Sequence, residues 1–178
     1  MKNKNDETIS PPKNEPNNNL GRINREIKKG IFYIGIDREK KLNGFTPFMF
    51  REIAKAYTEF ENNRDALCAL VYSHSNNFCA GMDLSLATPY MKAGDYDFIH
   101  PEKLIDPLSL FNLERTKPVI CAVRGITYTY GLELMLASDI AIAADNSRFA
   151  MLEVLRGVLM TGGATIRFIE RAGWSNAM

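Results

Sequence analysis

Three short runs of apolar residues constrain the fold of this chain more than any other feature. They lie at 67–72, 119–123 and 140–143, and none of them alternates between apolar and polar residues. Continuous apolar strands of this length are typical of parallel sheets that helices cover on both faces. A helix is expected at 131–138, between the second and third runs. The pattern therefore predicts an α/β fold with its chemistry at strand-to-helix turns.

The segment 46–62 carries the clearest helix signal. Thr46 can cap the amino end of this helix, and Pro47 suits its first position. Phe45 can pack onto Phe50 as a hydrophobic staple. The apolar residues of the segment recur at helical spacing, so one face of the helix is expected to be buried.

Other segments give weaker signals. Residues 31–36 are apolar and predict another strand, while Gly162 and Gly163 predict a tight turn into a helix at 164–172. Residues 92–107 are expected to form a polar loop, which either covers a site or only connects elements.

The chain is long enough for one domain. It has 178 residues, of which 46% are hydrophobic, so it can bury one core. Residues 1–22 are mostly polar and rich in Asn, Lys and Pro, which predicts a disordered tail. Residues 23–178 are expected to form the folded core.

Charge and apolar content exclude several classes of protein. The 22 Lys and Arg residues nearly balance the 21 Asp and Glu residues, which argues against a nucleic-acid-binding surface. No apolar run is long enough to span a membrane, and the amino end lacks the apolar stretch of a signal peptide.

The cysteines and histidines indicate neither a disulfide framework nor a metal site. Cys68, Cys79 and Cys121 are odd in number and dispersed, as expected for reduced core thiols of a cytoplasmic protein. His74 and His100 stand apart from each other, and both are expected to be solvated loop residues. We therefore expect no metal.

Two segments could together supply what a thioester enolate needs. Ala80 and Gly81 predict a tight turn that exposes the backbone N–H of Met82. Glu133 falls in the first turn of an apolar helix, and Glu153 follows twenty positions later. Backbone donors for an oxyanion and two acids for proton transfer form a catalytic layout. The residues alone also allow a plainer interpretation, in which Glu133 only favours the helix dipole and Glu153 is a loop acid.

Five short motifs follow one another along the chain. They are FCAGMDL at 78–84, KPVICAVRG at 117–125, GLELMLASD at 131–139, FAMLE at 149–153 and GGATIR at 162–167. In order and spacing they resemble the motifs of the crotonase (enoyl-CoA hydratase/isomerase) superfamily. The resemblance implies a crotonase-like spiral of ββα units acting on an acyl-CoA thioester, without the C-terminal helices of the family.

The resemblance also implies roles for individual residues. The backbone N–H groups of Met82 and Tyr130 match the family's oxyanion hole, although many members have glycine where Tyr130 stands. Glu133 and Glu153 match the two glutamates with which the hydratases hold and activate water. Since both are present, the resemblance favours an enoyl-CoA hydratase.

The CoA part of the substrate is expected near the Ala80–Gly81 turn. Lys40 and Lys41 are candidate phosphate contacts, but from the residues alone we favour a solvated turn for both. Asp83 lies at the same turn, and we interpret it as a helix cap. No cofactor is implied, because CoA is part of the substrate.

Two alternatives to the hydratase remain open. A Δ3-Δ2 enoyl-CoA isomerase would rely on Glu153 alone. A non-catalytic acyl-CoA-binding or assembly protein is suggested by Tyr130 and by the end of the chain at residue 178. Family members continue with helices that complete the acyl pocket and the trimer interface, so a full-length protein is expected to form a trimer or a dimer of trimers.

Overall fold

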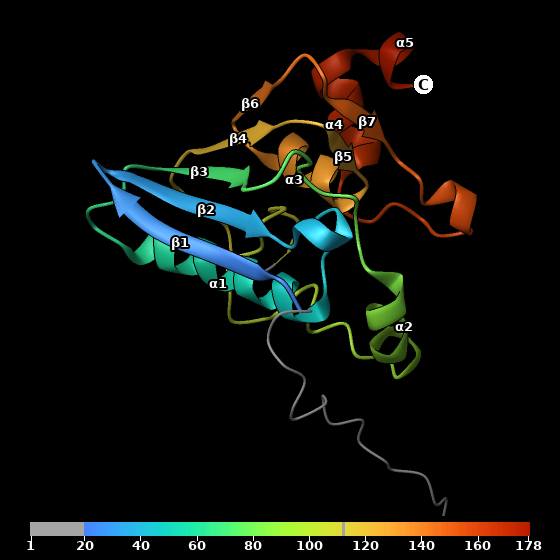
Figure 1. Ribbon diagram of the computed structural model, residues 1–178, viewed down its shortest axis with the longest axis horizontal. Helices are drawn as coiled ribbons and strands as arrows, with labels where there is room; N and C mark the ends of the chain where they lie inside the picture. The colour runs from blue at the N-terminus through green and yellow to red at the C-terminus, as the bar shows by residue number, and fades with distance from the viewer. Residues whose placement is uncertain (1–19, 112) are drawn as a thin grey trace, which may run out of the picture.

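A five-stranded sheet lies at the centre of the computed structural model, which describes residues 20–111 and 113–178 (Figure 1). Its strand order is β1-β2-β3-β4-β6; β1 pairs antiparallel to β2, and the other pairs are parallel. Strands β5 and β7 form a second, parallel pair. The bounds are β1 Arg22–Lys28, β2 Ile31–Asp37, β3 Cys68–Ser73, β4 Val119–Val123, β5 Ile126–Tyr128, β6 Ile140–Ala143 and β7 Arg148–Ala150.

Helices alternate with the parallel strands, so the predicted α/β class is confirmed. The α-helices are α1 Pro47–Asn62, α2 Leu84–Lys92, α3 Tyr130–Ala137, α4 Ala164–Ala172 and α5 Trp174–Ala177, and the short 3-10 helices are η1 Glu39–Lys41 and η2 Val154–Arg156. None of the helices in the described part of the chain is long and apolar enough to cross a membrane.

The main core lies between the sheet and α1. Alternate residues of β2, such as Phe32 and Ile34, are buried on the face toward this helix. The Phe32 ring lies 5.9 Å from the Phe60 ring of α1, measured between centroids. The predicted staple is present as well, because the Phe45 and Phe50 ring centroids are 5.3 Å apart.

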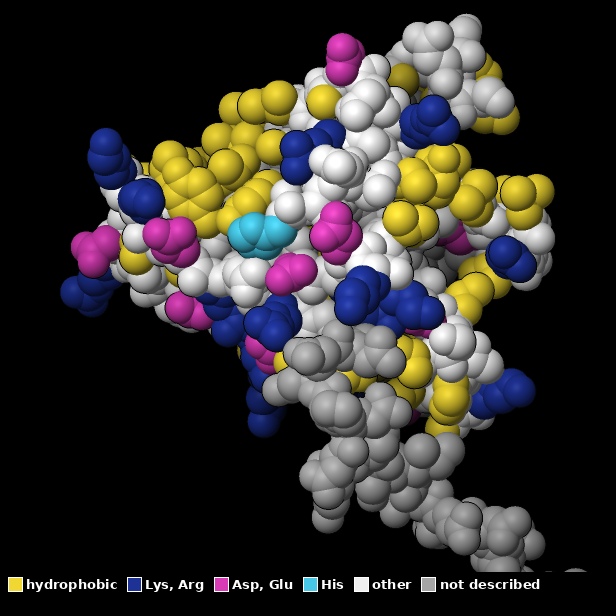
Figure 2. Space-filling view, in the orientation of Figure 1, with side chains coloured by type: hydrophobic (Ala, Val, Ile, Leu, Met, Phe, Trp, Pro, Cys, Tyr) yellow, Lys and Arg dark blue, Asp and Glu magenta, His cyan; other side chains and the backbone are white. Residues whose placement is uncertain are grey.

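The opposite face of the sheet is not covered by helices, which corrects the expectation from the apolar runs. One row of paired residues crosses four strands on this face, from Tyr33 through Leu70 and Ile120 to Ile140. The first three are half-buried, and Ile140 is 54% exposed. Figure 2 shows hydrophobic side chains gathered over β3, β4 and β6. Within the described residues, the lack of polar alternation therefore does not reflect cover on both faces.

Two further segments differ from the sequence-based expectation or add to it. Of the predicted tail at 1–22, residues 1–19 lie outside the described residues, and Arg22 already begins β1. The segment 92–107 has no helix or strand of its own beyond the end of α2 at Lys92.

The amino end of α1 is capped as predicted. The Thr46 side chain accepts a hydrogen bond from the Met49 amide at 3.2 Å and donates one to the Leu20 carbonyl at 2.7 Å. Thr46 is fully buried, so neither bond can be replaced by bulk water. The cap thus fixes both the start of α1 and the chain that enters β1.

Replacing Thr46 with alanine is expected to lower the free energy of unfolding by about 1–2 kcal/mol, because a buried helix cap is lost. Chemical denaturation would measure the change. Thr46→Ser keeps the hydroxyl and should retain most of the stability. An equal loss in both variants would show that the methyl group, and not the cap, stabilises this end of α1.

Candidate active site

The turn after β3 is joined to β5 by backbone hydrogen bonds. The Cys79 amide donates to the Ile126 carbonyl at 3.0 Å, and the Tyr128 amide donates to the Cys79 carbonyl at 2.8 Å. A Cβ on Gly131 would lie 2.5 Å from Cys79 Cβ, so only glycine allows α3 to begin this close to the turn. The predicted Ala80–Gly81 turn and the start of α3 are therefore neighbours.

Gly81 and Thr129 form the closest approach between these two segments. Gly81 has a φ of +103°, and a Cβ at this position would collide with Thr129 Oγ1. Thr129 itself has a φ of +49°, an unusual value for a β-branched residue. Backbone strain of this kind persists only where the surrounding structure enforces it. It occurs here directly before Tyr130.

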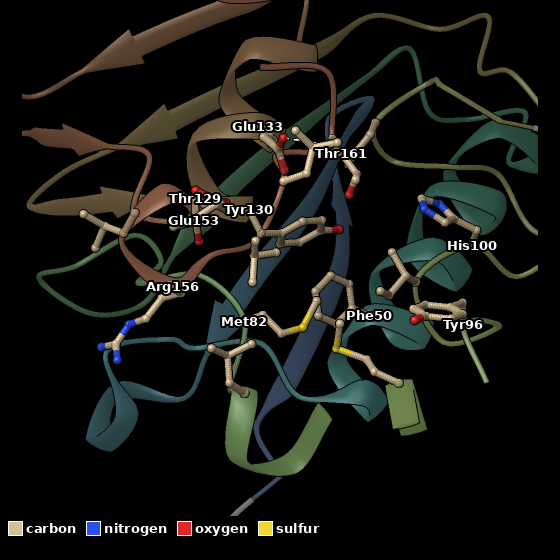
Figure 3. A pocket seen from close by; sticks show the side chains of 18 of the residues that line it. Phe50, Met82, Tyr96, His100, Thr129, Tyr130, Glu133, Glu153, Arg156 and Thr161 are labelled. Atoms are coloured by element: carbon tan, nitrogen blue, oxygen red, sulfur yellow. Dashed lines mark hydrogen bonds between the residues drawn. The ribbon is translucent and has the colours of Figure 1, made fainter. Parts of the chain in front are cut away.

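This approach brings the two predicted oxyanion donors to one cavity. Met82 and Tyr130 both line a cavity of about 520 Å³ (Figure 3). Neither backbone amide donates a hydrogen bond to another described residue. Tyr130 is the first residue of α3, where orphan N–H groups and the helix dipole favour negative charge. Two free amides beside one cavity are what an oxyanion hole requires.

Glu133 projects into this cavity from the first turn of α3. Its side chain is held by the Gly162 amide, which donates to Oε1 at 2.7 Å, and the residue is 5% exposed. Burial raises the pKa of the carboxyl group, and the nearby charge of Glu153 raises it further. The Gly162 and Ala164 amides oppose this rise without cancelling it. A Cβ on Gly162 would overlap the Glu133 carboxylate, so this contact also depends on a glycine.

Glu153 lines the same cavity from a different segment. It immediately precedes η2 and is half-buried, and its Oε2 has no hydrogen-bond partner among the described residues. Burial raises the pKa of this carboxyl group too. A buried carboxyl oxygen without a partner is free to exchange a proton with a bound molecule.

Tyr130 fills the space that a glycine would leave empty. Its ring centroid lies 4.8 Å from that of Phe45 and 4.4 Å from that of Phe50. The side chain therefore forms part of the cavity wall, while its backbone amide remains available.

Ala80 and Asp83, the other predicted residues of the turn, have different surroundings. Ala80 lines the cavity. Asp83 precedes α2, but its side chain caps no backbone amide and instead forms an ion pair with Arg38 at 2.8 Å. Asp83 therefore occupies the predicted N-cap position of α2, but its side chain forms no capping hydrogen bond. Burial acts to raise the pKa of Asp83, but hydrogen bonds from Ser85 and Arg38 outweigh it and lower the pKa.

Lys40 and Lys41 lie in η1, next to the turn but outside the cavity wall. Both are exposed. The Ala80 amide donates to the Leu42 carbonyl at 3.0 Å, which keeps η1 beside the turn. The two lysines thus lie in a segment next to the Ala80–Gly81 turn, and their role in CoA binding stays a prediction.

Cys79 shapes the turn instead of reacting there. Its sulfur accepts a hydrogen bond from the Gly81 amide at 3.2 Å. Burial raises the pKa of the thiol to about 12, so it stays protonated at neutral pH. Among the residues that the structure describes, no group of three or more His, Cys, Asp or Glu side chains could hold a metal ion.

Sequence reasoning missed two residues of the site. His100 was expected in solvent, yet it is half-buried, lines the cavity and packs against Phe111 with ring centroids 4.4 Å apart. Nothing local to His100 indicates this, because the surrounding loop is polar. Gly162 was interpreted only as a turn residue, although its amide anchors Glu133.

Free backbone amides and carboxyl groups with raised pKa values are the groups needed to stabilise a negative oxygen and to move protons, and this cavity brings them together. The chain belongs to the enoyl-CoA hydratase/isomerase family, whose model matches residues 26–178. It is similar to the 1,2-epoxyphenylacetyl-CoA isomerase of Escherichia coli (strain K12), with 31% identity over 85% of this chain and 58% of that protein. A probable peroxisomal enoyl-CoA hydratase 1 of Arabidopsis thaliana is also 31% identical, over 85% of this chain and 56% of that protein.

Solved structures confirm the predicted crotonase-like fold. A probable enoyl-CoA hydratase/isomerase from Mycobacterium abscessus superposes with a TM-score of 0.80 and 40% identity, over 89% of this chain and 60% of that one. An enoyl-CoA hydratase from Mycobacterium tuberculosis H37Rv gives a TM-score of 0.74 and 31% identity, over 88% and 59% of the two chains. The chain thus spans less than two thirds of the length of these relatives.

Replacing Gly81 with alanine is expected to destabilise the protein more than replacing Gly157. Both glycines have a positive φ, so both variants carry a backbone cost of about 1–2 kcal/mol. Only at Gly81 would the new Cβ also collide with Thr129, whereas Gly157 has open space around it. Denaturation curves would compare the free energies of unfolding. Equal losses would contradict the close approach of the two loops.

Glu133→Gln is expected to stabilise the protein at pH 7. The raised pKa means that the folded state favours the protonated carboxyl of Glu133. The stability that this protonation contributes is fully present below the ordinary pKa of 4.5 and is lost as pH rises through the folded-state pKa. Glutamine removes that loss, and its carbonyl can still accept from Gly162. The melting temperature of Glu133→Gln should therefore exceed that of the wild type by an amount that grows from pH 4 to pH 8. Glu170→Gln, at an exposed position, is the control. A difference in melting temperature that does not change with pH would show that ionisation of Glu133 is not its cause.

Proposed function

We propose that this chain acts on a 2-enoyl-CoA thioester as a hydratase. The observation that carries the proposal is that Glu133 and Glu153 line the same cavity as the free amides of Met82 and Tyr130. Membership of the enoyl-CoA hydratase/isomerase family supports the substrate class. The reaction proposed needs no cofactor, because CoA belongs to the substrate.

In the proposed mechanism the two amides stabilise the enolate. The thioester carbonyl accepts hydrogen bonds from the Met82 and Tyr130 N–H groups, so negative charge can build up on its oxygen. A water oxygen bonds to Cβ while Glu133 takes a proton from that water. Glu153 gives its proton to Cα, and the carbon–carbon double bond becomes a single bond. Proton return from Glu133 to Glu153 then restores the starting state.

The raised pKa values fit these roles. A glutamic acid with a raised pKa keeps its proton to higher pH than an ordinary one, so a larger fraction of it can act as a general acid near neutral pH. The charge of Glu153 adds to the cost of ionising Glu133, so joint ionisation of the two carboxyl groups is disfavoured. The proposed addition starts with the proton on Glu153.

The CoA portion is proposed to leave the cavity past the Ala80–Gly81 turn. Lys40 and Lys41 in the adjacent η1 would then face its phosphate groups as exposed positive charges. Their separation from the cavity wall suits a contact with the distant end of the substrate and not with its acyl group.

One observation favours the alternative of a Δ3-Δ2 enoyl-CoA isomerase. Glu133 is engaged by the Gly162 amide, whereas Oε2 of Glu153 has no partner among the described residues. An isomerase needs only one carboxyl group, which removes a proton from one carbon and returns it to another. Glu153 alone could carry out that transfer.

Glu153→Gln and Glu133→Gln separate the two reactions. For the hydratase, each variant should reduce hydration of 2-enoyl-CoA by at least about 100-fold, because a general acid or base is lost. Loss of enoyl-thioester absorbance would measure the rate, and Glu170→Gln on α4 is a matched control outside the cavity.

Other outcomes identify the alternatives. Isomerisation of 3-enoyl-CoA that survives Glu133→Gln but not Glu153→Gln would replace the hydratase by the isomerase. Binding of CoA esters by the folded wild-type chain without any turnover would contradict both and leave a non-catalytic binding protein.

A further inference from the structure

The hydroxyl group of Tyr130 ends inside the cavity without a partner. The residue is 8% exposed, and its ring is fixed between the rings of Phe45 and Phe50. No described residue forms a hydrogen bond with the phenol oxygen, which is open to the cavity. A bound molecule is therefore the natural source of the missing hydrogen bond.

His100 offers a second unpartnered group on the same cavity. Its Nδ1 atom is buried and has no hydrogen-bond partner among the described residues. Packing against Phe111 fixes the ring. In Figure 3 the Tyr130 hydroxyl points to the side of the cavity where His100 and Thr161 lie, away from Glu153. The cavity thus has a polar end that is distinct from its carboxylate end.

The polar end is suited to a neutral group. Burial raises the pKa of Tyr130 well above its ordinary value, and burial lowers the pKa of His100 in spite of the nearby charge of Asp106. Both side chains are therefore uncharged at neutral pH. Arg156 is the one Lys or Arg among the described residues of the cavity wall, and Figure 3 shows it on the opposite side. A carboxylate would find no counter-charge at this end.

We propose that Tyr130 and His100 bind a neutral oxygen, a hydroxyl or carbonyl group, on the acyl chain of the substrate. The inference rests on the proposed function and specifies its substrate class. Because Tyr130 also supplies a backbone amide to the oxyanion hole, one residue contacts both ends of the acyl group. The length of its side chain then sets how far the second oxygen lies from the thioester. Acyl chains without that oxygen leave the buried Nδ1 atom of His100 unpaired.

Binding of unreactive thioesters tests this inference apart from catalysis. Saturated acyl-CoA esters of four to eight carbons, each with and without a terminal hydroxyl, would be titrated into the 178-residue chain by calorimetry. At one chain length the hydroxylated ester should bind about tenfold more tightly, as expected for one buried hydrogen bond. Tyr130→Phe keeps the ring and the backbone amide and should abolish this preference.

Two further variants protect the test. His100→Leu should also weaken the preference, and it remains informative if Tyr130→Phe fails to fold. Tyr33→Phe removes a phenol hydroxyl from a half-buried residue outside the cavity wall, and it should keep the preference. Equal affinities for both esters at every length, or an unchanged preference in Tyr130→Phe, would overturn the inference.

The outcomes also separate this inference from the proposed function. A hydroxyl preference in a chain that turns over no enoyl thioester would support the inference and contradict the hydratase. Glutamate-dependent turnover without a preference would do the opposite. Absence of binding by every ester would overturn both.

Discussion

Close contact between two backbone segments is the constraint on which the rest of the site depends. The turn at Gly81 and the start of α3 at Gly131 approach so closely that neither position has room for a Cβ. This contact directs the amides of Met82 and Tyr130 to one cavity and forces Thr129 into a positive φ. It also sets the start of α3, where Glu133 follows Tyr130 by one helical turn. The absence of side chains at Gly81 and Gly131 therefore allows the backbone donors and the carboxyl groups to line one cavity.

The two carboxyl groups of the cavity lower the stability of the folded protein at neutral pH. Burial of Glu133 and Glu153 raises their pKa values, which makes the ionised forms costly in the folded protein. The Gly162 amide offsets part of this cost for Glu133, while Glu153 keeps an unpartnered oxygen. The more exposed acid is thus the less constrained one, and the anchored acid holds the geometry.

Local signals in the sequence predicted most of the secondary structure, because apolar runs and the cap at Thr46 act over a few residues. They did not predict β1, whose sequence between Arg22 and Lys28 is largely charged and polar and which is ordered by pairing with β2. The cavity residues were predictable only where a family motif covered them. His100 belongs to none of those motifs, and its position depends on contacts with Phe111 that the sequence does not reveal.

The uncovered face of the sheet governs how isolated molecules of this chain behave toward one another. The row from Tyr33 to Ile140 is apolar across four strands, and it ends at β6, whose outer edge is unpaired in the described structure. A net charge of +1 provides almost no repulsion to keep such faces apart. This surface therefore favours association of the molecules at high concentration, and salting-out conditions strengthen that tendency.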